Sequence, residues 1–497
     1  MTDINDSNYY LKKDKIDNNN DTFLYTTPQN KKDNYLVSYN CIFWNLIPNF
    51  SNTLLFFGVD MIMFHYVGQA KNIDLMDGLG LGRLFYGIAY FIGAGLTEGM
   101  AAECSKSFGI KNYSLLGAQA NQTRIIIIIF SLIYAIINIF FSNAILSFLI
   151  GPDKEYLNIG LTYIYYSLPA IIIELQYEVY CKLSESQLNY KPVIISLVTT
   201  FLISPFLCYI FIKYLGWGIV GCVVVLSIIQ VVKLLIMIYT YTFIIYDFSY
   251  DVMSKSLYCN NFWGLFKALF LSMVIFFADC AAGSISNGVS STLGKIPYGK
   301  YIVMVNIAQL FYSVDYGFIN SSCILVGNLI GNNSPELLVV LIRRLVFLSL
   351  VSAVPFIIII NLVPHAFVFF FSESEEIYLD IEMITLIIIL SIGAVADIFQ
   401  SNLQGILRGL GIMMPTIYSG LCSFFVFLPF LALFLTKYYN LGVKGVLIAD
   451  LCSYFLNGIV LFSILIKTDY KDCCEEYLKQ SYDHQYMSLE TSPNTIG

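Results

Sequence analysis

Charged residues are scarce in this chain of 497 residues. They make up 12% of it, half of the ~25% found in soluble proteins, whereas 57% of the residues are apolar and the mean hydropathy is +0.71. Apolar runs such as Arg124 to Ile150 exceed the ~20 residues with which a helix crosses a bilayer. These runs lack the alternation of a membrane β-barrel. We therefore predict an all-α polytopic membrane protein.

Several functional motifs are also missing. No GxxxxGK[ST] phosphate-binding loop occurs, which argues against an ATP-driven pump. The 12 cysteines form no CxxC pair and the three histidines lie far apart, so nothing suggests a metal site. A net charge of −7 gives no basic footprint for nucleic acid. We expect no cofactor, no metal and no nucleic-acid partner.

Twelve apolar segments follow one another along the chain, centred near residues 54, 91, 136, 170, 202, 231, 275, 315, 355, 395, 424 and 454. An even number of spans places both termini on one side of the membrane. The two tails and the loops after even-numbered spans hold about 18 of the 27 Lys and Arg residues, so the positive-inside rule predicts that both termini are cytoplasmic.

Polar segments flank and divide the spans. We predict a disordered cytoplasmic tail over 1–38, a six-helix bundle over 39–246, a cytoplasmic linker over 247–261, a second six-helix bundle over 262–467 and a loose cytoplasmic tail over 468–497. The tetrapeptide Tyr486-Met487-Ser488-Leu489 resembles a Tyr-x-x-Φ sorting signal. It favours the plasma membrane or a vacuolar or endolysosomal membrane.

The two predicted bundles repeat each other. Three pairs of landmarks recur at nearly one offset: KYLGWGIVG from Lys213 and KYYNLGVKG from Lys437 lie 224 positions apart, Gly109 and Gly331 lie 222 apart, and Pro192 and Pro415 lie 223 apart. A duplicated six-helix unit enters the membrane twice in the same orientation, which is the parallel repeat of some secondary transporters. We predict two pseudo-symmetric bundles around a central cavity.

Four segments of the chain resemble motifs of one transporter family. They are FFGVDMIMFHYVG (Phe56–Gly68), ECSKSFGIKNYSLLG (Glu103–Gly117), SSCILVGNLIGNNSPE (Ser321–Glu336) and LQGILRGLGIMMPTI (Leu403–Ile417). In order and spacing, over about residues 40–467, the chain resembles eukaryotic-type multidrug and toxic compound extrusion (MATE) transporters. The resemblance implies twelve helices in two bundles and export of organic compounds against an inward cation flow.

Acidic residues inside the spans are the candidate site residues, because a carboxylate at bilayer depth costs at least ~2.5–3.5 kcal/mol. The resemblance implies roles for four positions. Asp60 stands at an acidic position seen mainly in bacterial members, and Asp279 matches the second of two glutamates on the seventh helix. Asp397 falls where eukaryotic members carry an acid on the tenth helix, and Asn306 matches a polar position on the eighth.

The repeat offset adds a fifth candidate. Glu174 lies 223 positions before Asp397, so the two acids are expected at equivalent sites facing a shared cavity. Desolvation favours the protonated form of such an acid and a bound organic cation favours the carboxylate, so the two ligands compete for one site. The alternative for these residues is structural. Asp279 and Asp397 then hydrogen-bond polar neighbours, and Glu174 lies near the cytoplasmic end in contact with solvent.

Other polar residues within the spans are expected to have structural roles. Packing or hydrogen bonding accounts for Glu98, Asp315 and Asp450 at least as well as function does, and Arg408 is expected to anchor a cytoplasmic loop.

These observations favour a monomeric antiporter that exports organic cations or amphipathic compounds in exchange for protons, with sodium coupling as an open alternative. A second hypothesis is a lipid-linked oligosaccharide flippase, which would line its cavity with Arg and Lys. The basic residues here fall mainly in predicted loops, which disfavours it. A third is a membrane enzyme acting on lipids, which would require clustered His, Asp or Cys at one membrane face.

Overall fold

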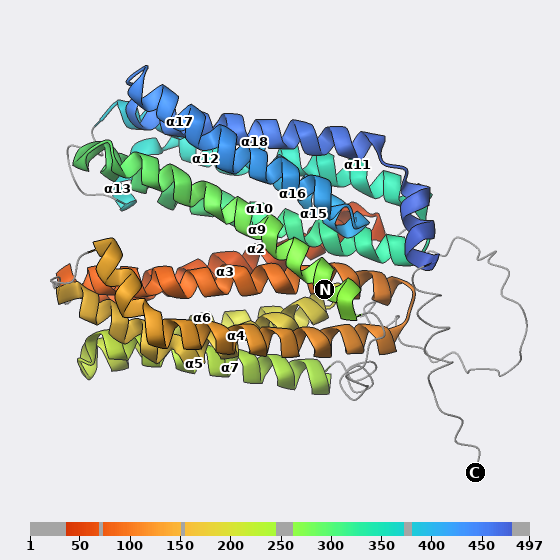
Figure 1. Ribbon diagram of the computed structural model, residues 1–497, viewed down its shortest axis with the longest axis horizontal. Helices are drawn as coiled ribbons and strands as arrows, with labels where there is room; N and C mark the ends of the chain where they lie inside the picture. Colours follow the sequence, from red (N-terminus) through yellow and green to blue (C-terminus); the bar gives the residue numbers. More distant parts are fainter. Residues whose placement is uncertain (1–35, 69–72, 151–154, 245–261, 372–379, 480–497) are drawn as a thin grey trace, which may run out of the picture.

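The computed structural model describes residues 36–68, 73–150, 155–244, 262–371 and 380–479, and the regular elements in these ranges are all helical (Figure 1). The first half of the chain forms six long helices: α2 (Tyr39–Gly68), α3 (Ile73–Gly109), α4 (Tyr113–Ile150), α5 (Glu155–Ser186), α6 (Lys191–Cys208) and α7 (Gly218–Tyr239). Short π-helical turns over Tyr209–Tyr214 and Thr240–Ile244 extend α6 and α7.

The second half repeats this pattern with more interruptions. Its helices are α9 (Phe262–Ser291), α10 (Lys295–Gly331), α11 (Pro335–Ser352), α12 (Val354–Leu362), α13 (Pro364–Phe371), α15 (Glu382–Leu410), α16 (Met413–Leu421), α17 (Leu428–Lys437) and α18 (Gly442–Lys467). Helices α11 and α12 together make one span, and a π-helical turn over Cys422–Phe427 joins α16 to α17.

The twelve predicted spans are confirmed. Eleven helical segments within the described residues are long and apolar enough to cross a membrane, and α5 is the twelfth. Its 32 residues give a length of about 48 Å at 1.5 Å per residue. The charged residues Glu174, Glu178, Lys182 and Glu185 lower the hydropathy of α5, so it crosses the membrane as a buried helix of the bundle.

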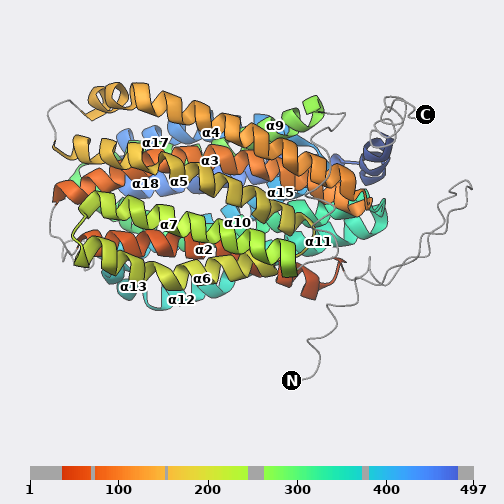
Figure 2. The same cartoon turned by 90° about the horizontal axis from the view of Figure 1, so that it is seen from below.

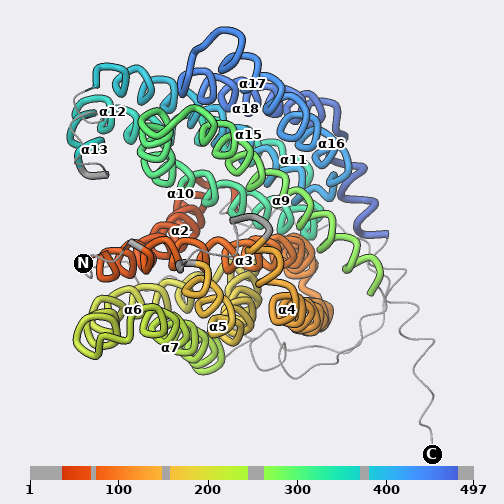
Figure 3. The backbone as a smooth tube through the Cα atoms, turned by 60° about the vertical axis from the view of Figure 1, so that its left-hand side comes forward, coloured from red at the N-terminus to blue at the C-terminus, as the bar shows by residue number. Residues whose placement is uncertain are grey.

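The helices form two lobes, as the duplication predicts. Figures 1 and 3 show α2–α7 grouped on one side and α9–α18 on the other, and in Figure 2 the first group lies in front of the second; we call these groups the N-lobe and the C-lobe. Equivalent helices pack alike: α3 packs on α5 in the N-lobe and α10 packs on α15 in the C-lobe. Between the lobes, α3 packs on α9 and α2 packs on α10, which is the reciprocal pattern of a two-fold axis.

Two repeat-related glycines mark where the lobes meet. A Cβ atom on Gly109 would lie 2.8 Å from the Cα of Gly331, and a Cβ on Gly331 would lie 2.8 Å from the Cα of Gly109. Real Cβ atoms do not approach other carbon atoms this closely, so only glycine permits this contact of two backbones. The ends of α3 and α10 therefore close one end of the molecule on the pseudo-two-fold axis.

The C-terminal segment differs from the prediction. Residues 470–479 are helical rather than loose. Cys474 is buried, and the Tyr477 hydroxyl lies 3.5 Å from the Ser107 hydroxyl at the end of α3. The composition of this segment is mainly polar, but its few apolar residues attach it to the closed end. Most of the predicted N-terminal tail, the linker 247–261 and the sorting tetrapeptide lie outside the described residues.

Candidate functional site

Asp279 and Asp397 come together in the C-lobe. Asp279 lies on α9 and Asp397 on α15, and both are half-buried. The Gln400 side-chain amide donates to both carboxylates, at 3.2 Å to Asp279 Oδ1 and 3.0 Å to Asp397 Oδ1. Gln400 stands three residues after Asp397, on the same helix face. The two acids expected from the sequence thus share one hydrogen-bond donor.

The orientation of Gln400 is fixed by its neighbours. Its Oε1 atom accepts hydrogen bonds from Gln404 Nε2 and from Asn457 Nδ2 on α18, both at 2.7 Å. These two donors define which end of the Gln400 amide carries the nitrogen, and that end faces the carboxylates.

A third carboxylate, which we had assigned to packing, belongs to this cluster. Asp315 on α10 is 3% exposed, interacts electrostatically with Asp279 and Asp397, and has one oxygen, Oδ1, without a hydrogen-bond partner among the described residues. No Lys or Arg of the described chain lies within ion-pair distance of these three acids. We call them the carboxyl cluster. Their mutual repulsion is relieved when a cation binds among them or when one takes up a proton.

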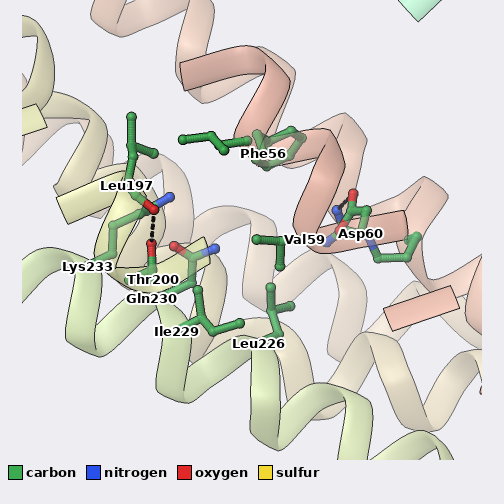
Figure 4. A pocket seen from close by; sticks show the side chains of 11 residues that line it. Phe56, Val59, Asp60, Leu197, Thr200, Leu226, Ile229, Gln230 and Lys233 are labelled. Carbon is green, nitrogen blue, oxygen red and sulfur yellow. Dashed lines mark hydrogen bonds and ion pairs between the residues drawn. The ribbon is translucent and has the colours of Figure 1, made fainter. Parts of the chain in front are cut away.

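Asp60 lies in a different setting in the N-lobe. It pairs with Arg83 of α3 beside a small pocket of about 30 Å³ that α2, α3, α6 and α7 line. Figure 4 shows Asp60 on one side of this pocket, and Gln230 and Lys233 of α7 on the other. The charge of Asp60 is already neutralised by a cation of the protein.

Glu174 is likewise paired. It is completely buried on α5, accepts a hydrogen bond from the Tyr86 hydroxyl, and lies 3.4 Å from the Lys233 ammonium group. The structural alternative of a solvated Glu174 near a membrane surface is therefore wrong. The expected equivalence with Asp397 is one of position in the repeat, whereas the electrostatic environments differ.

Asn306 stands apart from the other candidates. It is half-buried on α10, and the described contacts join it neither to the carboxyl cluster nor to Asp60 or Glu174.

An aromatic pocket lies between the lobes. Its cavity volume is about 20 Å³, roughly the space of one water molecule. Seven of its nine lining residues are aromatic: Phe56, Phe57, Tyr90 and Phe91 from the N-lobe, and Phe276, Tyr312 and Tyr316 from the C-lobe, with Asn52 and Thr53 completing the wall. Ring faces of this kind attract organic cations. Side chains of both lobes thus meet around a small cavity at their interface.

The carboxyl cluster adjoins this pocket. Phe276 and Asp279 are three residues apart on α9, and Tyr312 and Asp315 are three residues apart on α10, so each pair shares a helix face. Asp279 also interacts electrostatically with Tyr312. Aromatic side chains therefore form the wall and acids lie directly behind it.

Basic residues also lie inside the bundles, contrary to our expectation that they fall mainly in loops. Arg408, expected to anchor a loop, is completely buried, and its Nη1 atom lies 3.1 Å from Glu98 Oε2 across the lobe interface. Lys182 lies 3.0 Å from Glu98 Oε1 and is also completely buried. Their partners stand on other helices, so the sequence offered no local signal for these pairs.

Comparison with known proteins gives a consistent result. The MatE family model matches residues 48–210 and 272–433, one segment in each lobe. Protein DETOXIFICATION 15 of Arabidopsis thaliana is 21% identical over 437 residues, covering 86% of this chain and 87% of that protein. Multidrug and toxin extrusion protein 1 of Homo sapiens is 21% identical, covering 90% and 77%. The crystal structure of the eukaryotic MATE transporter AtDTX14 superposes with a TM-score of 0.80 at 17% identity, covering 90% of this chain and 99% of that one.

Proposed function

The chain belongs to the MatE family of membrane transporters, and from this premise we propose that it exports organic cations in exchange for protons. The observation that supports this most directly is the carboxyl cluster: three aspartates, with no Lys or Arg of the described residues within ion-pair distance, lie next to helix positions that line an aromatic pocket between the lobes. Such a site attracts a positively charged, partly apolar ligand.

Competition between two ligands supplies the coupling. An organic cation against the aromatic wall is stabilised by ionised Asp279 and Asp397, and protons on these acids remove that attraction. Proton uptake on one side of the membrane then releases the cargo there. After the lobes rearrange, proton loss on the other side restores the site, which is alternating access with one exchangeable positive charge.

The direction and location of transport are part of the proposal. The excess of Lys and Arg in the tails and in the loops after even-numbered spans supports cytoplasmic termini. The closed end at Gly109 and Gly331 then faces the cytoplasm. We propose a monomer in the plasma membrane or in a vacuolar or endolysosomal membrane, which uses the cation gradient and no cofactor.

The flippase hypothesis is less well supported. A pyrophosphate-linked lipid requires basic groups that are free to bind phosphate. Arg83, Lys182 and Lys233 of the N-lobe each lie within ion-pair distance of a carboxylate. Their charges are balanced by the protein itself.

Transport by reconstituted protein tests the proposal. Proteoliposomes with an acidic interior are expected to take up radiolabelled tetraethylammonium, and Asp397→Asn or Asp279→Asn should reduce uptake to the level of protein-free vesicles. Asp77→Asn, at an exposed acid near the start of α3, is the matched control and should transport normally. Uptake driven only by an imposed sodium gradient, or wild-type uptake by Asp397→Asn, would contradict the proton assignment.

A further inference from the structure

Four acids of the N-lobe form ion pairs in two charge-balanced groups. In one group, Asp60 pairs with Arg83 and Glu174 pairs with Lys233. In the other, Glu98 and Glu185 share Lys182, at 3.0 Å each, and Glu98 also pairs with Arg408 of the C-lobe. Each group holds two acids and two bases.

Glu178 lies between these groups and belongs to neither. It stands on α5, four residues after Glu174 and four before Lys182, so the three share one helix face. It is 1% exposed, and no Lys or Arg of the described residues lies within ion-pair distance. Its Oε2 atom has no hydrogen-bond partner among the described residues. A buried carboxylate without a counter-ion is unfavourable, so either a bound proton or a nearby cation would stabilise this position.

One hydrogen bond links Glu178 to the aromatic pocket. The Tyr90 hydroxyl donates to Glu178 Oε1 at 3.3 Å, and the Tyr90 ring lines the pocket between the lobes. That ring stacks on Phe56, with centroids 5.0 Å apart and an interplanar angle of 15°. A cation bound against the pocket wall therefore lies next to the residue that contacts Glu178.

The ionisable surroundings of Glu178 come from four helices. Its own helix α5 contributes Glu174, Tyr177, Cys181, Lys182 and Glu185. Three other helices contribute Tyr90 of α3, Lys233 of α7 and Tyr316 of α10. Both lysines lie closer to other carboxylates, so neither is a dedicated partner of Glu178.

We propose that Glu178 is an additional proton-exchange residue, located in the N-lobe and coupled to the aromatic pocket through Tyr90. The proposal rests on the function proposed above and adds a second carboxyl site on the opposite lobe. When an organic cation occupies the pocket, its charge stabilises the Glu178 carboxylate, and the proton leaves to water in the pocket. When the cation departs, the acid takes a proton back, and no other bond changes.

Proton release on ligand binding is the direct test. Full-length protein in detergent is titrated with ethidium, whose fluorescence reports binding, while a pH-indicator dye in weak buffer counts released protons. Wild-type protein is expected to release protons, and Glu178→Gln to release fewer, by up to one per bound ethidium. One exchanged proton changes ethidium affinity tenfold per pH unit. We expect this pH dependence of affinity to be correspondingly weaker in Glu178→Gln. Glu336→Gln, at an exposed acid of α11, is the control and should match wild type.

A second variant tests the link independently of the folding of Glu178→Gln. Tyr90→Phe keeps the ring that lines the pocket and removes the hydroxyl, so we expect the pH profile of ethidium affinity to shift. An unchanged pH profile in Tyr90→Phe, or an unchanged proton count in Glu178→Gln, overturns the role of Glu178. If wild-type protein binds ethidium without releasing protons and shows no pH-driven uptake of tetraethylammonium, the proposed function itself fails. These outcomes are distinguishable because the carboxyl cluster is tested separately by Asp397→Asn.

Discussion

The Glu98–Arg408 pair is expected to hold the closed end of the molecule together. Glu98 of α3 accepts hydrogen bonds from two groups of the C-lobe, Arg408 Nη1 at 3.1 Å and the Tyr316 hydroxyl at 3.2 Å, and from Lys182 of its own lobe. The two contacts across the interface exist only while α3 lies against α10 and α15. We therefore predict that Glu98→Gln destabilises the closed arrangement specifically.

The size of the effect follows from the burial of Arg408. Glu98→Gln keeps the side-chain volume but leaves the guanidinium group without a carboxylate partner, while Lys182 retains Glu185 at 3.0 Å. Breaking one side of a buried ion pair costs about 3–5 kcal/mol. Because 1.4 kcal/mol corresponds to tenfold, the ratio of closed to open molecules should fall by a factor of roughly 10² to 4 × 10³.

Hydrogen–deuterium exchange measures this shift in the ratio of closed to open molecules without attaching a probe to the protein. The backbone amides of 98–109 and 319–331, at the meeting ends of α3 and α10, should exchange faster in Glu98→Gln. The matched control is Glu103→Gln, five residues further along α3, whose partner Lys106 lies 2.9 Å away in a partly exposed pair. Because this pair joins two residues of α3 and does not cross between the lobes, a smaller change than in Glu98→Gln is expected. Wild-type exchange at both segments in Glu98→Gln would refute this reasoning.

Two further substitutions test the contact between the lobes and the charge of the C-lobe. Gly331→Ala places a Cβ 2.2 Å from the Lys106 carbonyl oxygen, so the thermal unfolding midpoint and tetraethylammonium uptake should both fall. The control is Gly288→Ala, whose Cβ meets open space and which should change neither. Asn457→Lys replaces the amide that donates to Gln400, the hydrogen-bond donor of Asp397, by an ammonium group. We expect ethidium affinity to fall while circular dichroism remains helical. Retained affinity would show that the charge of the cluster is not what binds the cation.

The spans, their order and the duplication were predictable because they depend on local composition and on chain spacing. Gly109 and Gly331, noticed only as repeated landmarks, prove to touch each other on the pseudo-two-fold axis. Asp279 and Asp397 were candidates because a carboxylate inside an apolar run is visible in the sequence itself.

The partners of the acids were not predictable in the same way. Arg83 lies 23 positions from Asp60, Lys233 lies 59 from Glu174, and Arg408 lies 310 from Glu98, and in each case the pair joins different helices. Helix periodicity fixes which face a residue occupies, but the packing of whole helices decides which face it meets. Asp315 was set aside for the same reason, because its neighbours Asp279 and Asp397 stand on other helices.

The repeat relates Glu174, which pairs with a lysine, to Asp397, which has no Lys or Arg within ion-pair distance among the described residues. Helices α7 and α18 begin at Gly218 and Gly442, both with positive φ and 224 positions apart. With this offset, Lys233 of α7 corresponds to Asn457 of α18.

The two equivalent side chains have different effects on their lobes. The Lys233 ammonium group lies 3.4 Å from Glu174, whereas the Asn457 amide donates to Gln400 at 2.7 Å and so orients the donor that contacts Asp397. One position therefore carries a basic side chain in the N-lobe and a neutral amide in the C-lobe. The duplicated backbone supplies two similar acid sites. The residue at this one position therefore differs in charge between the lobes, and under the proposed mechanism this difference favours the C-lobe as the main exchange site.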